Sequence, residues 1–500
     1  MKGKKCLVIV LILLLAFSLF SCRKKQETTE YYRNFSSRPA LTTAKKISLQ
    51  GYRFDSFLNR GMILVSETQG SDKRYGVIGE QGELVLPVKY SSITMTGDFF
   101  LARGNLDETL YSVIDLKGDA ILETNNYIEI SDVGDGMVAV IEDSYATLYN
   151  EKGENVLPGS NFDYSYDFVS CGDFVLVKSA KRNSAFIFRT RTSENLLRFI
   201  GSEDTEYSVD YLGGNDFVVI CNERVSAKTE GAVAFVKGSE TTYYLQKVYR
   251  YTIGVEKPTR LETDRFLYSV GSRYSFGLTE EDREYYPLKE GVFSVRYYVT
   301  DGGKADGSLA YYIGNDSLSE LGSLPEGVSP LVKMVDGLVA FGAPSGAIYF
   351  VNDALEVVKV IDDAQYQSVV WYGDAVIASK IGESGVRKFG GFDRAGGTIL
   401  SFEYSYISAF VDGKTVVTKE GKAYLADGKG SFEYLAEESV PFAWDGYYEI
   451  REGSRAGLRS FGGVTLLSPS YDEVAGARRY GNRVFVAMSI ADVTDIFVLS

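Results

Sequence analysis

A short turn rich in Gly, Asp and Asn, followed by an apolar strand, recurs along almost the whole chain. Gly97-Asp98, Asp135-Gly136 and Asp336-Gly337 are three of about twelve such turns, and their mean spacing is about 38 residues. A period of this length indicates a repeat protein in which each copy is one supersecondary unit. The same period explains why residues 74–93 align without a gap with residues 455–474.

Each copy reads as four short antiparallel strands. Apolar and aromatic runs alternate with Gly-containing turns, and the second copy predicts strands over Tyr90–Met95, Phe99–Arg103, Leu110–Leu116 and Asp119–Glu123. Beyond the first residues, no stretch sustains the apolar period of a helix, so helices should be nearly absent. Four strands in about 40 residues is the size of one β-propeller blade.

The predicted fold is therefore all-β and of the β-propeller class. Because about twelve units exceed the number of blades usual in one ring, we predict two tandem propellers of about six four-stranded blades each, over residues 46–289 and 290–500. The junction is expected near Leu288–Gly291, and a five-plus-seven division with a junction near residue 248 fits nearly as well. One large irregular propeller or a β-solenoid is the alternative architecture.

The two ends of the repeat region are expected to pair. The last copy supplies only three strands, over Tyr471–Gly481, Asn482–Ile490 and Thr494–Leu499. Thr42–Leu49 reads as a spare strand that precedes the first copy. We predict that this spare strand completes the last blade, because closure leaves only short, protected edges.

Several copies share a local pattern: an aromatic–Gly pair, a turn glycine, an aliphatic pair with Pro, and a final aromatic residue. In the first copy the pattern comprises Tyr75-Gly76-Val77-Ile78, Gly82, Val85, Leu86-Pro87 and Tyr90, and in the eleventh Ala456-Gly457, Gly463, Leu466-Leu467, Pro469 and Tyr471. Weaker echoes lie at 111–122, 145–158 and 386–407. This pattern resembles the WG repeat family, except that both tryptophans of the chain lie outside the aromatic–Gly position. The resemblance implies a β-repeat body involved in binding, and it brings no catalytic residues because the family pattern contains none.

Residues 1–21 read as a processing signal. A basic start leads into an apolar run from Leu7 to Phe20, which is shorter than a bilayer-spanning helix and matches a signal-peptide core. The run ends in Leu19-Phe20-Ser21-Cys22, which resembles the bacterial lipobox and implies cleavage before Cys22 and acylation of that residue. A plain secretory signal is the alternative. Residues 22–45 then form the lipidated end and a polar tether.

Composition narrows the partners and the chemistry. The chain has 53 basic and 67 acidic residues, a net charge of −14, so a nucleic-acid partner is not expected. It contains no histidine, which excludes Ser-His-Asp and Cys-His catalysis and His-ligated zinc. No cofactor or metal site is expected either, because DGGKADG at 301–307 lacks the carboxylate alternation of a calcium loop.

Cys171 and Cys221 are the two cysteines of the repeat region. An oxidising compartment would allow them to pair. Their places at opposite ends of neighbouring copies instead favour two separate, buried thiols.

The best candidates for a contact surface are aromatic residues at blade turns. The chain has 36 tyrosines, and tyrosine is enriched in recognition surfaces because it adds contact area at low entropy cost. The candidates expected on one rim are Trp371, Tyr372, Trp444, Tyr447 and Tyr448.

These observations predict a lipid-anchored protein of the bacterial cell envelope. Acyl chains on Cys22 would tie it to a membrane, and the body would face the periplasm or the cell surface. We expect a non-enzymatic scaffold whose partner is another envelope protein. The alternative is a carboxylate- or tyrosine-based glycan hydrolase or lyase with its site in a propeller channel.

Overall fold

In a computed structural model, the chain is described from residue 41 to residue 500 with several short segments left out. The segments outside the description are 105–109, 238, 264–265, 274, 277–285, 288–291, 300–303, 314–315, 321–328, 331–337, 344, 346, 353–355, 362–365, 373–374, 383, 393–397, 409, 428–429, 438–442, 445 and 481–482. In the described part there is one 3-10 turn, Asn59–Gly61, and no α-helix. None of these residues forms a helix with the length and apolar character that crossing a membrane requires.

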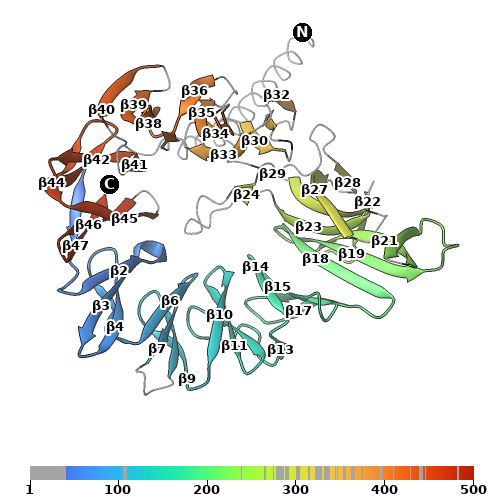
Figure 1. The fold of residues 1–500 in the computed structure, drawn as a ribbon. Coiled ribbons are helices and arrows are strands. Elements are labelled where there is room, and N and C mark those ends of the chain that lie inside the picture. The colour runs from blue at the N-terminus through green and yellow to red at the C-terminus, as the bar shows by residue number, and fades with distance from the viewer. Residues whose placement is uncertain are drawn as a thin grey trace, which may run out of the picture. The chain divides into compact units, whose positions relative to one another are not determined.

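The described residues form two compact units, shown in Figure 1. The large unit comprises Ala44–Val328 and Ser470–Leu499. The small unit contains Ser329–Pro469.

The large unit begins with four sheets of four strands, each sheet formed by consecutive antiparallel strands. In chain order these are β2 (Arg53–Phe57), β3 (Ile63–Gln69), β4 (Asp72–Ile78) and β5 (Leu84–Tyr90); β6 (Ser92–Thr96), β7 (Phe99–Arg103), β8 (Tyr111–Asp115) and β9 (Ala120–Thr124); β10 (Ile128–Gly134), β11 (Met137–Glu142), β12 (Tyr145–Asn150) and β13 (Phe162–Asp163); β14 (Asp167–Cys171), β15 (Phe174–Ser179), β16 (Ser184–Arg189) and β17 (Asn195–Ile200).

A nine-stranded sheet follows, in which two blade-like groups are joined edge to edge. Its strands are β18 (Thr205–Gly213), β19 (Asp216–Val225), β20 (Val233–Lys237), β21 (Glu240–Thr252), β22 (Thr259–Thr263), β23 (Leu267–Arg273), β26 (Val292–Val299), β27 (Lys304–Ile313) and β28 (Ser317–Glu320). The join is a parallel pairing of β22 with β28. β24 (Ser275–Phe276) and β25 (Tyr286–Pro287) form a separate two-stranded sheet.

The small unit repeats the four-stranded arrangement. Its sheets are β29 (Ser329–Pro330), β30 (Leu338–Gly342), β31 (Ile348–Asn352) and β32 (Val357–Ile361); β33 (Tyr366–Tyr372), β34 (Ala375–Ile381), β35 (Arg387–Phe392) and β36 (Thr398–Tyr404); β37 (Tyr406–Ile407), β38 (Lys414–Lys419), β39 (Lys422–Asp427) and β40 (Phe432–Ala436); β41 (Ala443–Trp444), β42 (Tyr447–Glu452), β43 (Arg455–Ser460) and β44 (Thr465–Tyr471).

These sheets confirm the predicted fold class: all-β, built from four-stranded antiparallel blades of the β-propeller type. Agreement extends to single strands in the second copy, where the predicted strand Phe99–Arg103 is β7 itself and its neighbours differ by one or two residues at their ends. The number of propellers and the domain division stay predictions, and the proposed junction at Leu288–Gly291 lies outside the described residues.

Successive sheets stack on one another and bury their apolar faces between them. In the large unit, Phe99 and Val113 of one sheet pack with Ile128 and Val138 of the next. In the small unit, Ile377 of sheet β33–β36 packs with Val417 of sheet β37–β40. Burial of this kind is worth about 25 cal/mol per Å² of apolar surface, so stacking is the main stabilising contact between copies.

The strand that precedes the first copy does complete the last one. β1 (Ala44–Ile47) pairs antiparallel with β47 (Val493–Leu499), in a sheet that also contains β46 (Arg483–Ile490) and β45 (Glu473–Tyr480). Ile47 of β1 is buried with Ile496 and with Ile63 of the neighbouring sheet. The predicted pairing of the two ends is therefore confirmed.

The aromatic–Gly pattern has a structural cause in the third strand of its blades. A Cβ on Gly76 would lie 2.7 Å from the carbonyl oxygen of Leu86, and a Cβ on Gly457 would lie 2.5 Å from that of Leu467. The backbone of the outer strand thus passes directly over both glycines, which leaves no room for a side chain. The aromatic residue Tyr75 is paired with Tyr90 across the same strands.

Replacement of either glycine by alanine should therefore destabilise the protein. For Gly76→Ala and Gly457→Ala we expect a loss of about 1–3 kcal/mol, because the new methyl group must displace backbone. Urea unfolding followed by tryptophan fluorescence and circular dichroism measures the change. Gly476→Ala is the matched control, since a Cβ there meets nothing closer than 3.9 Å. Equal effects at all three positions would show that close approach of the outer strand is not the reason for the pattern.

Candidate functional site

The aromatic residues predicted to form a contact surface occupy different environments. Tyr447 and Tyr448 are 0% and 3% exposed, so the expectation of a surface contact is wrong for these two. They are consecutive residues of β42 and point to opposite faces, and both faces are covered. Trp444 is half-buried and meets the ring of Tyr447 edge-on at 6.4 Å between centroids.

The other predicted site residues are Trp371, Tyr372 and Cys22. Trp371 and Tyr372 end β33, but their side chains lie outside the description. Cys22 also lies outside the described residues.

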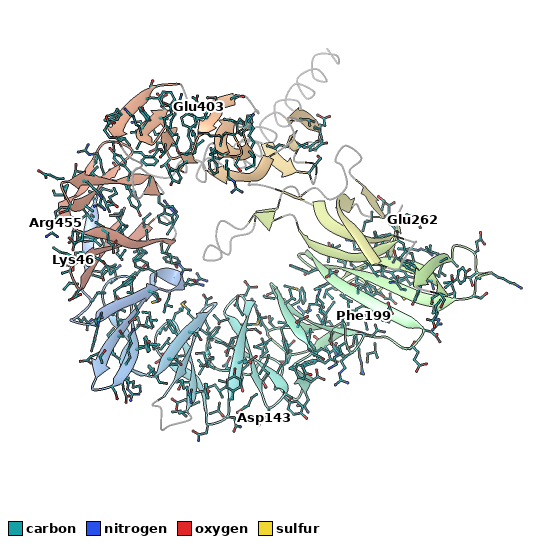
Figure 2. All side chains as sticks on the ribbon, in the orientation of Figure 1. Lys46, Asp143, Phe199, Glu262, Glu403 and Arg455 are labelled. Carbon is teal, nitrogen blue, oxygen red and sulfur yellow. The ribbon has the colours of Figure 1, made fainter. Side chains whose placement is uncertain are left out.

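Three strongly exposed tyrosines gather at one end of sheet β10–β13. Tyr127 precedes β10, Tyr145 begins β12 and Tyr164 follows β13. Because antiparallel strands alternate in direction, these three points lie at the same end of the sheet, close to Asp143 in the β11–β12 turn (Figure 2). Their exposures are 65%, 61% and 58%, and we call this set the tyrosine surface.

Neighbouring groups order two of these rings. The hydroxyl of Tyr127 donates to Glu129 Oε1 at 3.1 Å, and this hydrogen bond raises the pKa of Tyr127. Its ring meets Tyr111 edge-on at 5.7 Å between centroids. Lys181 Nζ lies 5.4 Å from the centroid of Tyr164, a cation–π contact. The tyrosine surface therefore combines exposed aromatic area with hydrogen-bonding and charged groups.

Asp163 holds the outer part of the tyrosine surface in place. It pairs with Tyr145 across β12 and β13. Its carboxylate accepts hydrogen bonds from the Ser165 hydroxyl, from the Ser165 backbone N–H at 2.9 Å and from Arg182 Nε at 3.0 Å. These hydrogen bonds, with Ser165 first and Arg182 second, lower the pKa of Asp163 to about 2.

Sequence reasoning missed this surface because it looked for paired aromatic residues. Tyr127, Tyr145 and Tyr164 are single tyrosines, each next to a polar turn. The sequence signal that could have predicted this surface is a single tyrosine beside a polar turn, as Tyr127 follows Asn126 and Tyr145 follows Asp143-Ser144.

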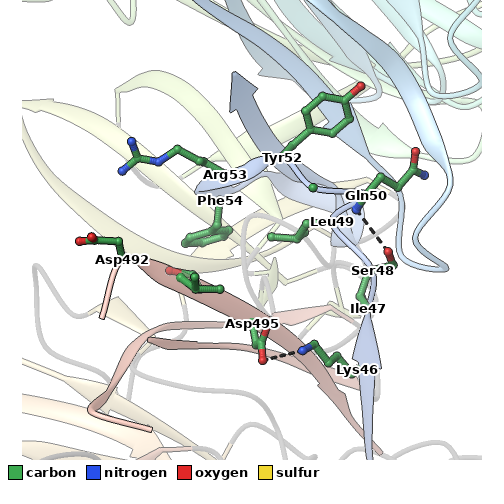
Figure 3. Close-up of a pocket in the computed structure, with 13 residues that line it drawn as sticks. Lys46, Ile47, Ser48, Leu49, Gln50, Tyr52, Arg53, Phe54, Asp492 and Asp495 are labelled. Atoms are coloured by element: carbon green, nitrogen blue, oxygen red, sulfur yellow. Dashed lines mark hydrogen bonds and ion pairs between the residues drawn. The ribbon is translucent and has the colours of Figure 1, made fainter. Parts of the chain in front are cut away.

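A cavity of about 360 Å³ lies where β1 turns into β2 (Figure 3). It is lined by Lys46–Phe54 and Asp492–Asp495, and we call it the terminal pocket. Gln50 and Gly51 have φ values of 55° and 87°, the two consecutive left-handed residues of a type I′ turn. Figure 3 shows Lys46 directed at Asp495, where Nζ and Oδ2 are 2.6 Å apart.

The polar wall of the terminal pocket serves strand pairing. Asp495 Oδ2 also accepts a hydrogen bond of 2.9 Å from the hydroxyl of Tyr471. Burial and this hydrogen bond raise the pKa of Tyr471 to about 12. The Asp495 carboxylate therefore binds both the Lys46 ammonium group and the Tyr471 hydroxyl, and its ion pair with Lys46 links β1 to β47. Because of these contacts, the carboxylate is not free for acid–base catalysis.

Cys171 and Cys221 are free thiols and both are buried, as predicted. Burial raises the pKa of the Cys171 thiol to about 12 and also raises that of Cys221. Both thiols are therefore protonated at neutral pH and weakly nucleophilic. Across the described segments, no group of three or more His, Cys, Asp or Glu side chains is placed to hold a metal ion.

Comparison with known proteins gives one family match, over residues 389–422, to the WG containing repeat. The matched segment overlaps the echo at 386–407 and begins with the aromatic–Gly pair Phe389-Gly390. Phe389 pairs with Tyr404 as Tyr75 pairs with Tyr90. A Cβ on Gly390 would lie 2.8 Å from the ring of Phe402. The WG repeat resemblance therefore holds for this segment.

Similar solved structures include a eukaryotic initiation factor, BamB from Moraxella catarrhalis and AztD from Citrobacter koseri. The initiation factor is 10% identical with a TM-score of 0.38, and the match covers 75% of this chain and 95% of that one. BamB is 11% identical with a TM-score of 0.25 and coverages of 82% and 96%. AztD is 11% identical with a TM-score of 0.27 and coverages of 79% and 94%. Likeness at this level carries no function to this chain, and no curated protein matches it.

The hydrogen bonds to Asp163 predict a pH-dependent contribution to stability. The folded pKa of about 2 lies below the ordinary value of 3.8. The carboxylate therefore stabilises the fold above about pH 4, and this stabilisation is lost as the pH falls towards 2. Asp163→Asn should lower the urea midpoint near neutral pH, and its difference from the unmodified protein should vanish by about pH 2. Asp143→Asn is the control, because Asn126 contacts that carboxylate only at 3.5 Å. A pH-independent difference for Asp163→Asn would refute the assignment.

Proposed function

We propose that this chain is a non-enzymatic scaffold, lipid-anchored in the bacterial cell envelope, whose WG-like repeat body binds another envelope protein. The tyrosine surface carries the proposal. Exposed tyrosines with polar neighbours are typical of protein recognition, because each rigid ring adds contact area and offers a hydroxyl.

The charge and architecture of the body support a binding role. Its sheets bury their apolar residues against each other, so that strand ends and outer strands remain for partners. The net charge of −14 keeps such a body away from anionic lipid and nucleic acid. For the alternative of a glycan hydrolase, the terminal pocket gives no support, because its carboxylate Asp495 is engaged by Lys46 and Tyr471.

The anchor rests on the sequence alone. An apolar run followed by Cys22 fits an acylated amino terminus, and two or three acyl chains hold a protein to a membrane stably where one does not. The polar segment that follows Cys22 would let the body stand off the lipid surface.

In-cell photocrosslinking tests the scaffold role. A photoreactive phenylalanine analogue at Tyr145 should form a discrete covalent adduct with one or a few envelope proteins in intact bacteria. Addition of Tyr127→Ser and Tyr164→Ser should reduce the adduct about tenfold, since loss of two anchoring rings removes one to two kcal/mol or more. The products are identified by mass spectrometry.

Two further arms decide the interpretation. The same analogue at Val255, which is 61% exposed in the same unit, should not yield this adduct. Cys22→Ala should release the protein from the membrane fraction and remove incorporation of labelled palmitate. Identical products from Tyr145 and Val255, or none from either, would contradict the scaffold role; membrane retention and labelling of the Cys22→Ala protein would contradict the anchor.

A further inference from the structure

The outermost strand of sheet β37–β40 exposes two aromatic side chains on one face. Phe432 and Tyr434 alternate along β40, so they point to the same side. They are 47% and 49% exposed. Figure 1 shows β40 at the outer end of its sheet, and in the strand order of the described residues nothing follows it.

The two rings are held by an aromatic cluster beneath them. Phe432 is stacked on Tyr404, with 6.3 Å between centroids and 21° between the ring planes. Tyr424 meets Phe432 at 6.4 Å and Tyr434 at 5.9 Å, both edge-on. Because these contacts already order the two rings, binding of a partner to them would cost little side-chain entropy.

The backbone of β40 presents its free hydrogen-bonding groups beside the same two residues. The N–H of Asp427 donates to the carbonyl oxygen of Ser431 at 3.0 Å across the β39–β40 turn. Because hydrogen-bonded and non-hydrogen-bonded positions alternate in an antiparallel pair, Glu433 directs its N–H and C=O towards β39. Phe432 and Tyr434 direct theirs towards the open edge.

Two other outer strands carry protecting residues that β40 lacks. β5 carries Pro87 and Lys89, and β44 carries Pro469, residues that block or discourage the addition of another strand. β40, with the sequence FEYLA, contains neither Pro nor Lys. Among the described side chains, β5, β17 and β32 each expose one large aliphatic residue, whereas β40 exposes two aromatic ones.

The charge around β40 selects the kind of strand that can add. Lys419 is paired with Glu403 at 2.8 Å and Lys422 with Glu437 at 3.1 Å, so these four charges balance. Glu420 lies close enough to Lys419 and Lys422 to raise the pKa of each, and Glu433 on β40 adds a further negative charge. The charges of the described residues along this edge therefore sum to a negative total. A second copy of this chain would bring Glu433 towards an identical carboxylate, a repulsive arrangement in a paired edge.

We propose that β40 accepts an extended, lysine- or arginine-rich strand of a partner protein by β-strand addition. Main-chain hydrogen bonds to Phe432 and Tyr434 supply affinity. Basic side chains of the partner meet Glu433 on one face of the added strand, and its alternate apolar side chains pack on the two rings on the other face. This deepens the proposed scaffold function and rests on it, with a site separate from the tyrosine surface.

Peptide binding to the full chain tests this site. The probe is a fluorescein-labelled, end-capped peptide of alternating Lys and Val, and the comparison peptide replaces each Lys by Glu. Fluorescence anisotropy in about 150 mM salt suppresses long-range attraction, because the screening length is then about 8 Å. We expect saturable binding of the basic peptide and at least about tenfold weaker binding of the acidic one.

Two variants separate the contributions of rings and backbone. Phe432→Ser combined with Tyr434→Ser should lower the affinity for the basic peptide about tenfold. Tyr434→Pro removes an outward-facing N–H that β39 does not use, and it should also lower this affinity about tenfold. Val255→Ser, at a residue of the large unit that is 61% exposed, should leave binding unchanged. Circular dichroism and the urea midpoint confirm that each variant is folded.

The outcomes are distinct from those of the scaffold test. Binding that survives both β40 variants, equal binding of the acidic peptide, or no binding at all would overturn strand addition at β40. If the adduct at Tyr145 persists in that case, the scaffold role stands without this site. If the peptide binds at β40 but photocrosslinking at Tyr145 gives no adduct, the strand-addition site is supported and the role of the tyrosine surface is contradicted.

Discussion

Within each unit, the stacking of four-stranded sheets against neighbouring sheets is the interaction on which the rest of this structure depends. β11 shows it in two consecutive residues: Val138 packs with the preceding sheet and Ala139 with the following one. β38 repeats the arrangement in the small unit, where Val417 packs with the preceding sheet and Val416 with the following one. A single copy would leave both of these faces in water, so no copy is stable by itself.

This stacking determines where a partner can bind. In sheet β41–β44 the second strand is covered on both faces, which is why Tyr447 and Tyr448 are core residues. Strand ends and outer strands are the parts left accessible. The tyrosine surface lies at the end of a sheet, and β40 is the outer strand of another sheet. Both candidate binding surfaces therefore lie where no neighbouring sheet of the described chain covers the side chains.

Local features of the fold were predictable because local chemistry determines them. Gly97 and Gly118 have φ values of 60° and 92°, a conformation that glycine adopts without strain, and their positions marked the ends of β6 and β8. The spare strand before the first copy was recognisable because the last copy has only three strands of its own. The aromatic–Gly pattern was recognisable, and its cause, the close approach of the outer strand over Gly76, needed coordinates.

Non-local features were not predictable from the same signals. The parallel pairing of β22 with β28 joins segments that no turn connects directly, and neither strand carries a residue that announces its partner. The burial of Tyr448 depends on its packing with Val416 and Leu425 in another sheet. The exposure of Tyr127, Tyr145 and Tyr164 depends on the register that brings three strand ends together. In each case the deciding contact comes from another strand.

The most direct test asks whether the fold loses stability when one strand is removed, and whether the same strand added as a separate peptide restores that stability. The measurement is the urea midpoint of a chain that begins at residue 50 and therefore lacks β1, with and without an added peptide of residues 41–49. If β1 covers the edge of β47 and buries Ile47 as described, the shortened chain unfolds at lower urea, and the peptide restores the midpoint while a scrambled peptide does not. An unchanged midpoint after removal of β1, or equal rescue by both peptides, would contradict the account.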